Sequence, residues 1–380
     1  MKKLKNISTE LSTIDDTLYQ CVANIDILDA IAPKNYQSEK ALFFEKKCSA
    51  NPNFAYKENN IALFEKKRAL FNIPIEKIRN KQLYRLYSEV IQAYIDKLDQ
   101  FRHIGHPEFL YDSLRYYGEP SQGELKNASY LLHITAGYQG VSSEHVAIED
   151  IQRYFENFAD ANQYPLNLTI EKGMIANALV SGEQVKISDN AKLSNIQLKA
   201  LAHHELGVHL ASTLNAQAQP LKILRLGSPV NTTTQEGLAM LCEYLAGFMT
   251  FERLRTLALR VIAVNSMITE KDFKRTFNLL IEEHHAEANQ AFAICARAYR
   301  GGGFTKDYLY LKGFQQVLAA YQSKVNIKNL LCGKVSLEQL SLVDNLIGQG
   351  YFIAPKFISP AIRRPSTTDP VLKFIVSAIK

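Results

Sequence analysis

The chain has 380 residues, of which 47% are hydrophobic and 22% charged. This composition is that of a globular protein with a sizeable core, and it excludes a disordered or fibrous chain. The net charge of +6 is modest for this length, and the basic residues are spread along the chain rather than clustered. We therefore expect no nucleic-acid binding.

Five cysteines without a CxxC pair predict neither a disulfide framework nor a thiolate metal site, and they favour a reducing compartment. The basic start, MKKLK, is followed by polar and acidic residues rather than by the apolar core of a signal peptide. No run of about 18 apolar residues could span a bilayer. We expect a cytoplasmic protein that is not inserted in a membrane, and the sequence leaves its oligomeric state open.

The apolar pattern predicts three regions that together form one composite domain. Residues 1–165 are mostly helical, with apolar positions at helical spacing from Leu83 to Leu98. Apolar and polar residues alternate from Leu166 to Ile170, and the segments 175–180 and 184–188 flank a Ser-Gly-Glu turn, which predicts a hairpin. Residues 166–325 form the predicted core, and residues 326–380 add helices and a Pro-rich wrap. The fold class is therefore α+β and mostly helical.

Several helix signals follow the hairpin. Ser194 and Gln197 predict a capping box, and the helix it begins carries apolar residues toward Leu210. A second helix is predicted over about 234–255 and a third over about 271–300, ending at three glycines. The tail has prolines at 355, 360, 365 and 370, which predicts an extended segment. The aromatics beside the turn at 116–121 are expected to pack in the core.

The first of these helices carries the motif HELGVH at 204–209, which offers the groups that hold a catalytic zinc ion. In the common HExxH motif, two histidines one turn apart bind zinc and the glutamate is the general base. Here the spacing is five, which leaves His204 and His209 roughly 140° apart on a regular helix. We therefore predict a π-bulge, made easier by Gly207. Ligand pairs that include His203 are alternatives with poorer geometry, and half-buried histidines without a metal are the simpler alternative.

Glu236 is the candidate third ligand, 27 residues after His209. It competes with a structural role, because Thr233 and Glu236 have the spacing of a capping box for the second helix. Gly237 favours the functional role, because a glycine in a helix costs about 1 kcal/mol and suggests close approach of another backbone or a metal site. Two histidines and one carboxylate would leave one zinc position open for water.

Two further stretches gather polar groups. The segment EEHHAE at 282–287 could bind a metal, but a solvated helix face is the more favoured interpretation. The segment 297–307 combines Arg297, Arg300 and Lys306 with a glycine loop at the start of a helix, which suits a carboxylate ligand. Tyr310 adds a hydroxyl nearby. A helix-connecting loop with surface charges is the alternative.

Together these motifs resemble the microtubule-associated tyrosine carboxypeptidase family, whose bacterial members are often labelled "flavohemoglobin expression-modulating QEGLA motif protein". The resemblance rests on HELGVH at 204–209 and QEGLA at 235–239, and it extends to RAYRG at 297–301 and FTKDYLYLKG at 304–313. It covers most of residues 165–320 and reaches, more weakly, the turn at 117–120.

The resemblance implies a zincin-like metallopeptidase with one Zn²⁺ ion that removes the C-terminal residue of a peptide or protein. His204, His209 and Glu236 would bind the zinc, and Glu205 would be the general base. From the chemistry we expect one of Arg297, Arg300 or Lys306 to bind the substrate's terminal carboxylate, and Tyr310 to stabilise the oxyanion. The competing hypothesis is a non-enzymatic metal-binding regulator of gene expression, and hydrolysis of a non-peptide amide is a third.

Overall fold

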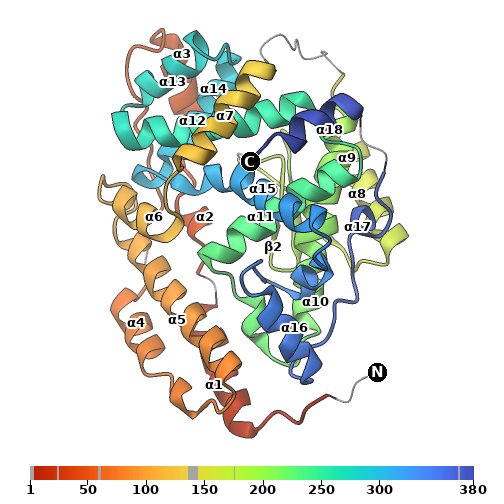
Figure 1. The fold of residues 1–380 in the computed structure, drawn as a ribbon. Coiled ribbons are helices and arrows are strands. Elements are labelled where there is room, and N and C mark those ends of the chain that lie inside the picture. The colour runs from red at the N-terminus through yellow and green to blue at the C-terminus, as the bar shows by residue number, and fades with distance from the viewer. Residues whose placement is uncertain (1–3, 24, 59–60, 136–143, 175, 367–368) are drawn as a thin grey trace. The chain divides into compact units, whose positions relative to one another are not determined.

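The structure is a computed structural model that describes residues 4–23, 25–58, 61–135, 144–174, 176–366 and 369–380 (Figure 1). These residues form helices and one small sheet. They divide into two compact units, each built from segments that lie far apart in the sequence. Unit 1 comprises residues 1–16, 139–251 and 312–380, and unit 2 comprises residues 17–138 and 252–311. Among the described residues, the boundaries between the units fall within helix α1 (Thr9–Val22), after the first residue of α12 (Phe251–Glu270) and within helix α15 (Leu309–Gln322).

Unit 1 contains the sheet of the described residues and helices that both precede and follow it. Its elements are α8 (Ile148–Asn162), β1 (Asn167–Glu171), β2 (Ala178–Ser181), β3 (Gln184–Ser188), α9 (Asn195–His204), the π-helix η2 (Glu205–Leu210), α10 (Ala211–Gln217), η3 (Lys222–Arg225), α11 (Pro229–Leu245), η6 (Ile327–Cys332), α16 (Leu340–Gly348), α17 (Pro360–Arg363) and α18 (Pro370–Ser377).

The predicted hairpin is confirmed. Strands β2 and β3 pair in antiparallel register, with Ser181 opposite Gln184 across a two-residue turn. Gly182 in that turn has a φ of 58°, the left-handed conformation that a tight hairpin requires and that glycine adopts at little cost. Strand β1 pairs in parallel with β3 on its other edge, so the order is β1-β3-β2.

The sheet packs against the helix that carries the HELGVH motif. Val185 and Ile187 of β3 share a buried apolar cluster with Leu198 of α9 and with Leu206 and Leu210 of η2. The predicted capping box at the start of α9 is confirmed, because the Ser194 side chain accepts from the backbone of Gln197 and the Gln197 side chain accepts in return. The helix is therefore fixed at its first turn and along one side before the motif begins.

Unit 2 is helical in its described residues. Its elements are α2 (Ile27–Ala30), α3 (Tyr36–Glu45), α4 (Leu63–Phe71), η1 (Ile75–Lys77), α5 (Lys81–Arg102), α6 (Phe109–Tyr117), α7 (Gln122–Ile134), α12 (Phe251–Glu270), α13 (Phe273–Glu282), α14 (Ala288–Tyr299), η4 (Arg300–Gly302) and η5 (Thr305–Tyr308). The long helix α5 confirms the periodic pattern of residues 83–98, and nearly all of those apolar positions are buried. Tyr116 and Tyr117 are also buried, as expected for core packing.

Two segments that the sequence predicts as single helices each form two helices in the structure. The predicted helix over 234–255 ends at Leu245 and a new one begins at Phe251, because Gly247 has a φ of 79° between them. The predicted helix over 271–300 is interrupted at 283–287, where His285 has a φ of 49°. A left-handed residue ends an α-helix because the helical hydrogen bonds cannot continue through it.

The tail is less extended than predicted. Pro360 and Pro370 each occupy the first turn of a short helix, α17 and α18, where a missing backbone N–H is harmless. The segment between them contacts the end of α11, since the backbone N–H of Ser366 donates to the Leu245 carbonyl at 2.7 Å. None of the helices in the described part of the chain combines the length and the apolar character needed to cross a membrane.

Candidate metal centre

His204 and His209 lie on the same side of their helix because the helix widens between them. Residues Glu205–Leu210 form a π-helix, in which hydrogen bonds join residues five apart rather than four. Residues at a spacing of five therefore stack along one face, and the two imidazole rings are 5.0 Å apart between centroids. The predicted π-bulge is confirmed.

Gly207, in the middle of this π-helix, has a packing role. A Cβ at this position would lie 3.0 Å from the Ser359 Oγ of the tail, closer than ordinary contacts. The glycine thus lets the tail approach the widened turn, and Ser359 itself is fully buried.

Glu236 lies in the middle of helix α11 rather than at its start. The helix begins at Pro229, and the Ser228 side chain caps it by accepting from the Asn231 backbone. The alternative role of Thr233 and Glu236 as a capping box is therefore not formed, and the predicted helix start near residue 234 is wrong, because an earlier Ser-Pro pair already supplies the start signals. The Glu236 carboxylate belongs instead to the group that it forms with the two histidines.

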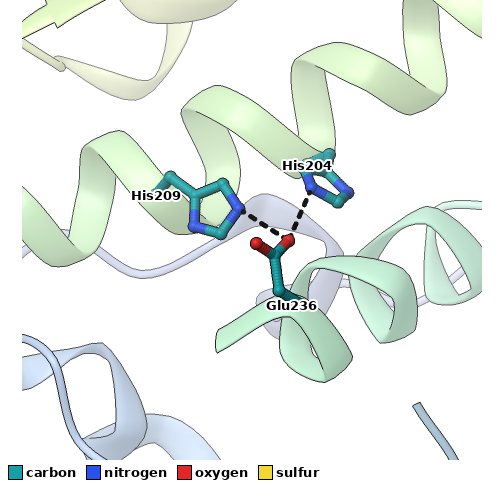
Figure 2. A group of neighbouring side chains, drawn as sticks. All are labelled: His204, His209 and Glu236. Carbon is teal, nitrogen blue, oxygen red and sulfur yellow. Dashed lines mark ion pairs between the residues drawn. The ribbon is translucent and has the colours of Figure 1, made fainter. Parts of the chain in front are cut away.

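Figure 2 shows both imidazoles, carried by one helix, directed at the carboxylate of Glu236 on another. The Nε2 atoms of His204 and His209 are each 3.5 Å from the same Glu236 oxygen. One ligand atom from each residue lies within 4.8 Å of the other two, so the three can hold a metal ion together. All three side chains are largely shielded from solvent.

The residues on either side of Glu236 fix its position. The Gln235 amide donates to the carbonyl oxygens of Leu330, Gly333 and Val335, and its own oxygen accepts from Ser212. A Cβ on Gly237 would lie 2.1 Å from the Gly313 carbonyl carbon, so only glycine permits this approach of α11 and α15. The sequence expectation of a close backbone approach at Gly237 is confirmed.

Glu243 is a member of the site that the sequence reasoning missed. His204 Nδ1 donates to the Glu243 carboxylate at 2.7 Å, and both groups are buried. Metal-binding histidines commonly donate their other ring nitrogen to a carboxylate in this way, which fixes the ring and makes it a better ligand. The sequence spacing could have indicated Glu243, because it follows Glu236 by seven residues and so lies two helical turns along the same face of the helix.

The electrostatics of the group suit a cation. Burial lowers the pKa of His204, but hydrogen bonds to Glu236 and Glu243 outweigh burial and raise it to about 10. Carboxylates that stabilise a positive charge on His204 would equally stabilise a bound cation. Two imidazole nitrogens and one carboxylate form a donor set typical of a zinc site.

Glu205 and His203 flank the ligand His204 and differ in surroundings. Glu205 is buried within the π-helix. The His203 ring packs edge-on against Phe158 at 5.0 Å and lies 5.7 Å from Phe248, and burial lowers its pKa to about 4. His203 is not part of the ligand group, so the ligand pairs that include it are not formed in this structure.

The predicted substrate-binding residues belong to unit 2, and the candidate metal ligands belong to unit 1. Arg297 donates two hydrogen bonds to Asp307, at 2.5 and 2.8 Å, and Lys306 Nζ is 3.5 Å from the Tyr310 hydroxyl. Arg260, which the sequence analysis did not single out, lies 3.9 Å from the same Asp307 carboxylate. We call the group of Arg260, Arg297, Arg300, Lys306 and Asp307 the cationic cluster.

The three glycines after Arg300 form a packed turn rather than an open loop. A Cβ on Gly301 would lie 2.7 Å from the Phe109 ring, and one on Gly302 would lie 2.2 Å from the His106 carbonyl oxygen. Their φ values of 74° and 111° are also ones that glycine adopts readily. The turn therefore holds Arg300 rigidly at the end of α14.

The stretch at 282–287 lies in the turn between α13 and α14, so its interpretation as a helix face is wrong. Most of its charged side chains are exposed, and Glu287 caps α14 by accepting from the Gln290 backbone. Among the described residues it does not form a group of potential metal ligands.

Comparisons with known proteins find sequence similarity over most of the chain. A family model described as "Microtubule-associated tyrosine carboxypeptidase" matches residues 41–380. The chain is 23% identical over 339 residues to microtubule-associated tyrosine carboxypeptidase 1 of Homo sapiens, covering 85% of this chain. The match spans 62% of the human protein, less than two thirds of its length.

Two solved structures are also similar in part. One is "the putative lipoprotein from Colwellia psychrerythraea", with a TM-score of 0.47 and 14% identity over 92% of this chain and 78% of the other. The second is "a putative lipoprotein of unknown function from Shewanella oneidensis", with a TM-score of 0.40 and 13% identity over 91% of this chain and 89% of the other.

The family model covers residues 41–380, which include the group of His204, His209 and Glu236. The chain therefore belongs to the microtubule-associated tyrosine carboxypeptidase family.

Proposed function

We propose that the protein is a zinc-dependent, zincin-like carboxypeptidase that removes the C-terminal residue of a peptide or protein. The observation that carries the proposal is the group of His204, His209 and Glu236, whose ligand atoms lie within 4.8 Å of one another in a chain of this family. The π-helix, the Gly237 crossing and the Glu243 hydrogen bond all serve to hold these three side chains in place.

In this proposal His204, His209 and Glu236 hold the zinc ion, with Glu243 behind His204. When bound, zinc supplies Lewis acidity toward a carbonyl oxygen and lowers the pKa of water. Glu205 accepts a proton from the attacking water and passes it to the leaving amine. Glu205 directly follows the ligand His204 in the sequence, which places it beside the ligand group. The burial of the Glu205 carboxylate strengthens its interactions with nearby charge.

The exopeptidase specificity is assigned to cationic residues of the family motifs. Carboxylates are best recognised by guanidinium and ammonium groups, so one of Arg297, Arg300 or Lys306 is proposed to bind the terminal carboxylate of the substrate. Tyr310 is proposed to stabilise the oxyanion through its hydroxyl.

The second candidate function is that of a non-enzymatic metal-binding regulator. A structural zinc site is normally closed by four protein ligands, whereas a hydrolytic site keeps one position open. Within the described residues the ligand group contains three members, which favours the enzyme.

The test is a mass-spectrometric screen of a peptide library with varied C-terminal residues, using wild type and Glu205→Gln in parallel. Wild type should remove one terminal residue, and the variant should lose about 10²–10⁴-fold in rate because it lacks a proton acceptor. Zinc content measured on both proteins should be equal, and chelation should abolish cleavage by wild type. Equal rates for the two proteins would contradict the role of Glu205, and zinc-loaded wild type that cleaves nothing would favour the regulator.

A further inference from the structure

Two segments of the C-terminal region contact both of the helices that carry the candidate metal ligands. The segments are residues 330–335 and residues 353–359, and we call them together the C-terminal brace. Residues 353–359 form neither a helix nor a strand. Buried side-chain amides from α10 and α11 supply the hydrogen bonds that hold both segments in place.

Asn215 ties the helix that carries His209 to both segments of the brace. It lies in α10, which directly continues the π-helix of His209. The Asn215 amide nitrogen donates to the carbonyl oxygens of Leu331 and Phe357, at 2.8 and 2.7 Å. The amide oxygen accepts from the backbone N–H groups of Lys356 and Phe357, both at 2.9 Å. One side chain therefore fixes the two segments to each other and to α10.

Gln219 forms a second clamp just beyond the end of the same helix. Its amide nitrogen donates to the carbonyl oxygens of Cys332 and Ile353, at 3.3 and 2.9 Å, and its oxygen accepts from the Ile353 N–H at 2.9 Å. Asn215 is 1% exposed and Gln219 5%. Buried amides are costly to leave without partners, so the brace and this helix stay together.

Gln235 ties the helix that carries Glu236 to the same brace. Its buried amide nitrogen lies 3.0–3.2 Å from three carbonyl oxygens of residues 330–335. The Ser212 hydroxyl of α10 donates to the Gln235 oxygen at 3.1 Å. The Gln235 side chain thus joins α10, α11 and the first segment of the brace, and it does so at the position next to the ligand Glu236.

The second segment also packs against the middle of the π-helix. Ser359 is fully buried, and its Oγ lies 3.0 Å from where a Cβ of Gly207 would be. The Tyr164 hydroxyl donates to the Ile358 carbonyl at 3.1 Å, which holds the segment against this turn. A π-helix is rare and depends on its surroundings, so the brace helps to keep His204 and His209 on one face.

We propose that Asn215 and Gln235 are positioning residues, which hold His209 and Glu236 at metal-binding distance through the C-terminal brace. Zinc binding and docking of the brace then stabilise each other, because the coupling between two binding events is reciprocal. The choice of zinc rests on the proposed function, whereas zinc affinity and hydrogen exchange are measured without catalysis.

Zinc affinity separates positioning from a general loss of stability. Asn215→Leu and Gln235→Met remove the amide hydrogen bonds at similar side-chain size, and each should weaken zinc binding by about tenfold or more in chelator competition. Thr276→Val is the matched control, because it removes two buried hydroxyl bonds of unit 2, at 2.7 and 2.8 Å. It should lower Tm but leave zinc affinity within about twofold. Unchanged zinc affinity in either amide variant would overturn the proposal.

Hydrogen exchange tests the same coupling in wild type, so it does not depend on whether a variant folds. The backbone N–H groups of Ile353, Lys356 and Phe357 donate to the clamping amides, and their exchange therefore reports docking of the brace directly. Saturating zinc should slow their exchange by about tenfold or more relative to zinc-free protein. The Lys274 N–H, which donates to the Asn51 side chain at 2.9 Å in unit 2, is the matched control and should not respond.

The outcomes distinguish this proposal from the proposed function. Exchange at the brace that is equal with and without zinc would overturn the coupling, and zinc-dependent peptide cleavage by the same protein would leave the carboxypeptidase intact. Exchange that slows with zinc, in protein that cleaves no peptide, would support the brace and contradict the carboxypeptidase. Cobalt in place of zinc adds a spectroscopic check: the ligand-field spectrum should change in Gln235→Met and stay the same in Thr276→Val.

Discussion

The metal centre of unit 1 and the cationic cluster of unit 2 are both buried groups of charged side chains, and they are opposite in sign. The metal centre brings Glu205, Glu236 and Glu243 around two histidines, whereas the cluster brings four cations around Asp307. In the first, hydrogen bonds to Glu236 and Glu243 raise the pKa of His204 and so stabilise a positive charge there. In the second, Asp307 is ion-paired with Arg297 and lies 3.9 Å from Arg260. The two groups thus differ in the sign of the side chains that are in the majority.

The largest effect that tests this comparison is expected from Asp307→Asn, which removes the only carboxylate of the cationic cluster. Breaking a buried ion pair costs about 3–5 kcal/mol because the partner charge is left without compensation. We therefore expect the free energy of unfolding at neutral pH to fall by about that amount. Denaturant titration of wild type and variant would measure it. Asp29→Asn, in the exposed pair with Lys57, is the control and should cost about 1 kcal/mol or less.

The same variant predicts a pH dependence. Burial raises the pKa of Asp307, but Arg297 and Arg260 outweigh burial and hold it below the ordinary value of 3.8. A carboxyl whose pKa is lowered by folding contributes stability that is complete above the unfolded pKa and is lost as pH falls below it. Wild type should therefore lose its advantage over Asp307→Asn only below about pH 4. A constant difference between the two proteins down to pH 2 would contradict the ion-pair interpretation.

The metal centre could be predicted from sequence because its chemistry is local, and the cationic cluster could not. His204, Glu205 and His209 share one helix, so spacing alone indicated the π-bulge that the structure contains. The ligand Glu236 came from a family motif. Arg260 lies on a different helix from Arg297, and no pattern in the sequence links them. Their proximity is a property of the tertiary fold.

The helix ends that the sequence prediction missed have a local physical cause. Apolar residues continue past the end of α11 as far as Met249, and no proline or glycine interrupts residues 271–300, so the sequence predicted one helix in each case. The breaks depend on single residues with positive φ, at Gly247 and His285. Glycine adopts such a conformation readily, whereas histidine adopts it much less often, so the exposed His285 gave no signal of a helix end.

The second effect concerns the support of Glu236, because the helix that carries it, α11, touches α15 at Gly237 and Gly313. Gly237→Ala would place a methyl group 2.1 Å from the Gly313 backbone, which cannot move without displacing α15. We expect a loss of about 1–3 kcal/mol in the free energy of unfolding, the usual cost of overpacking, and weaker zinc binding as Glu236 shifts. Calorimetry and competition with a zinc chelator would measure the two effects.

Gly348→Ala is the matched control for that substitution. Gly348 is also at a helical position of unit 1, but a Cβ there would meet no atom within 4 Å. Alanine should therefore be neutral or stabilising by up to about 1 kcal/mol. Equal stability of the two variants would mean that the α11–α15 crossing tolerates a side chain, and that the position of Glu236 depends on Gln235 alone.

The smallest effect is expected from Glu243→Gln, which changes the charge of the metal centre while keeping its shape. The amide oxygen can still accept from His204 Nδ1, so the ring should stay in place, but the negative charge behind the ligand is lost. Substitutions of such supporting carboxylates typically reduce metal affinity 10–100-fold, and chelator competition would measure this. Glu183→Gln, at the exposed hairpin turn, should leave the affinity unchanged. If Glu243→Gln binds zinc as tightly as wild type, then zinc affinity depends on the position of the His204 ring and not on the negative charge behind it. The electrostatic contrast with the cationic cluster would then hold only for Glu205 and Glu236.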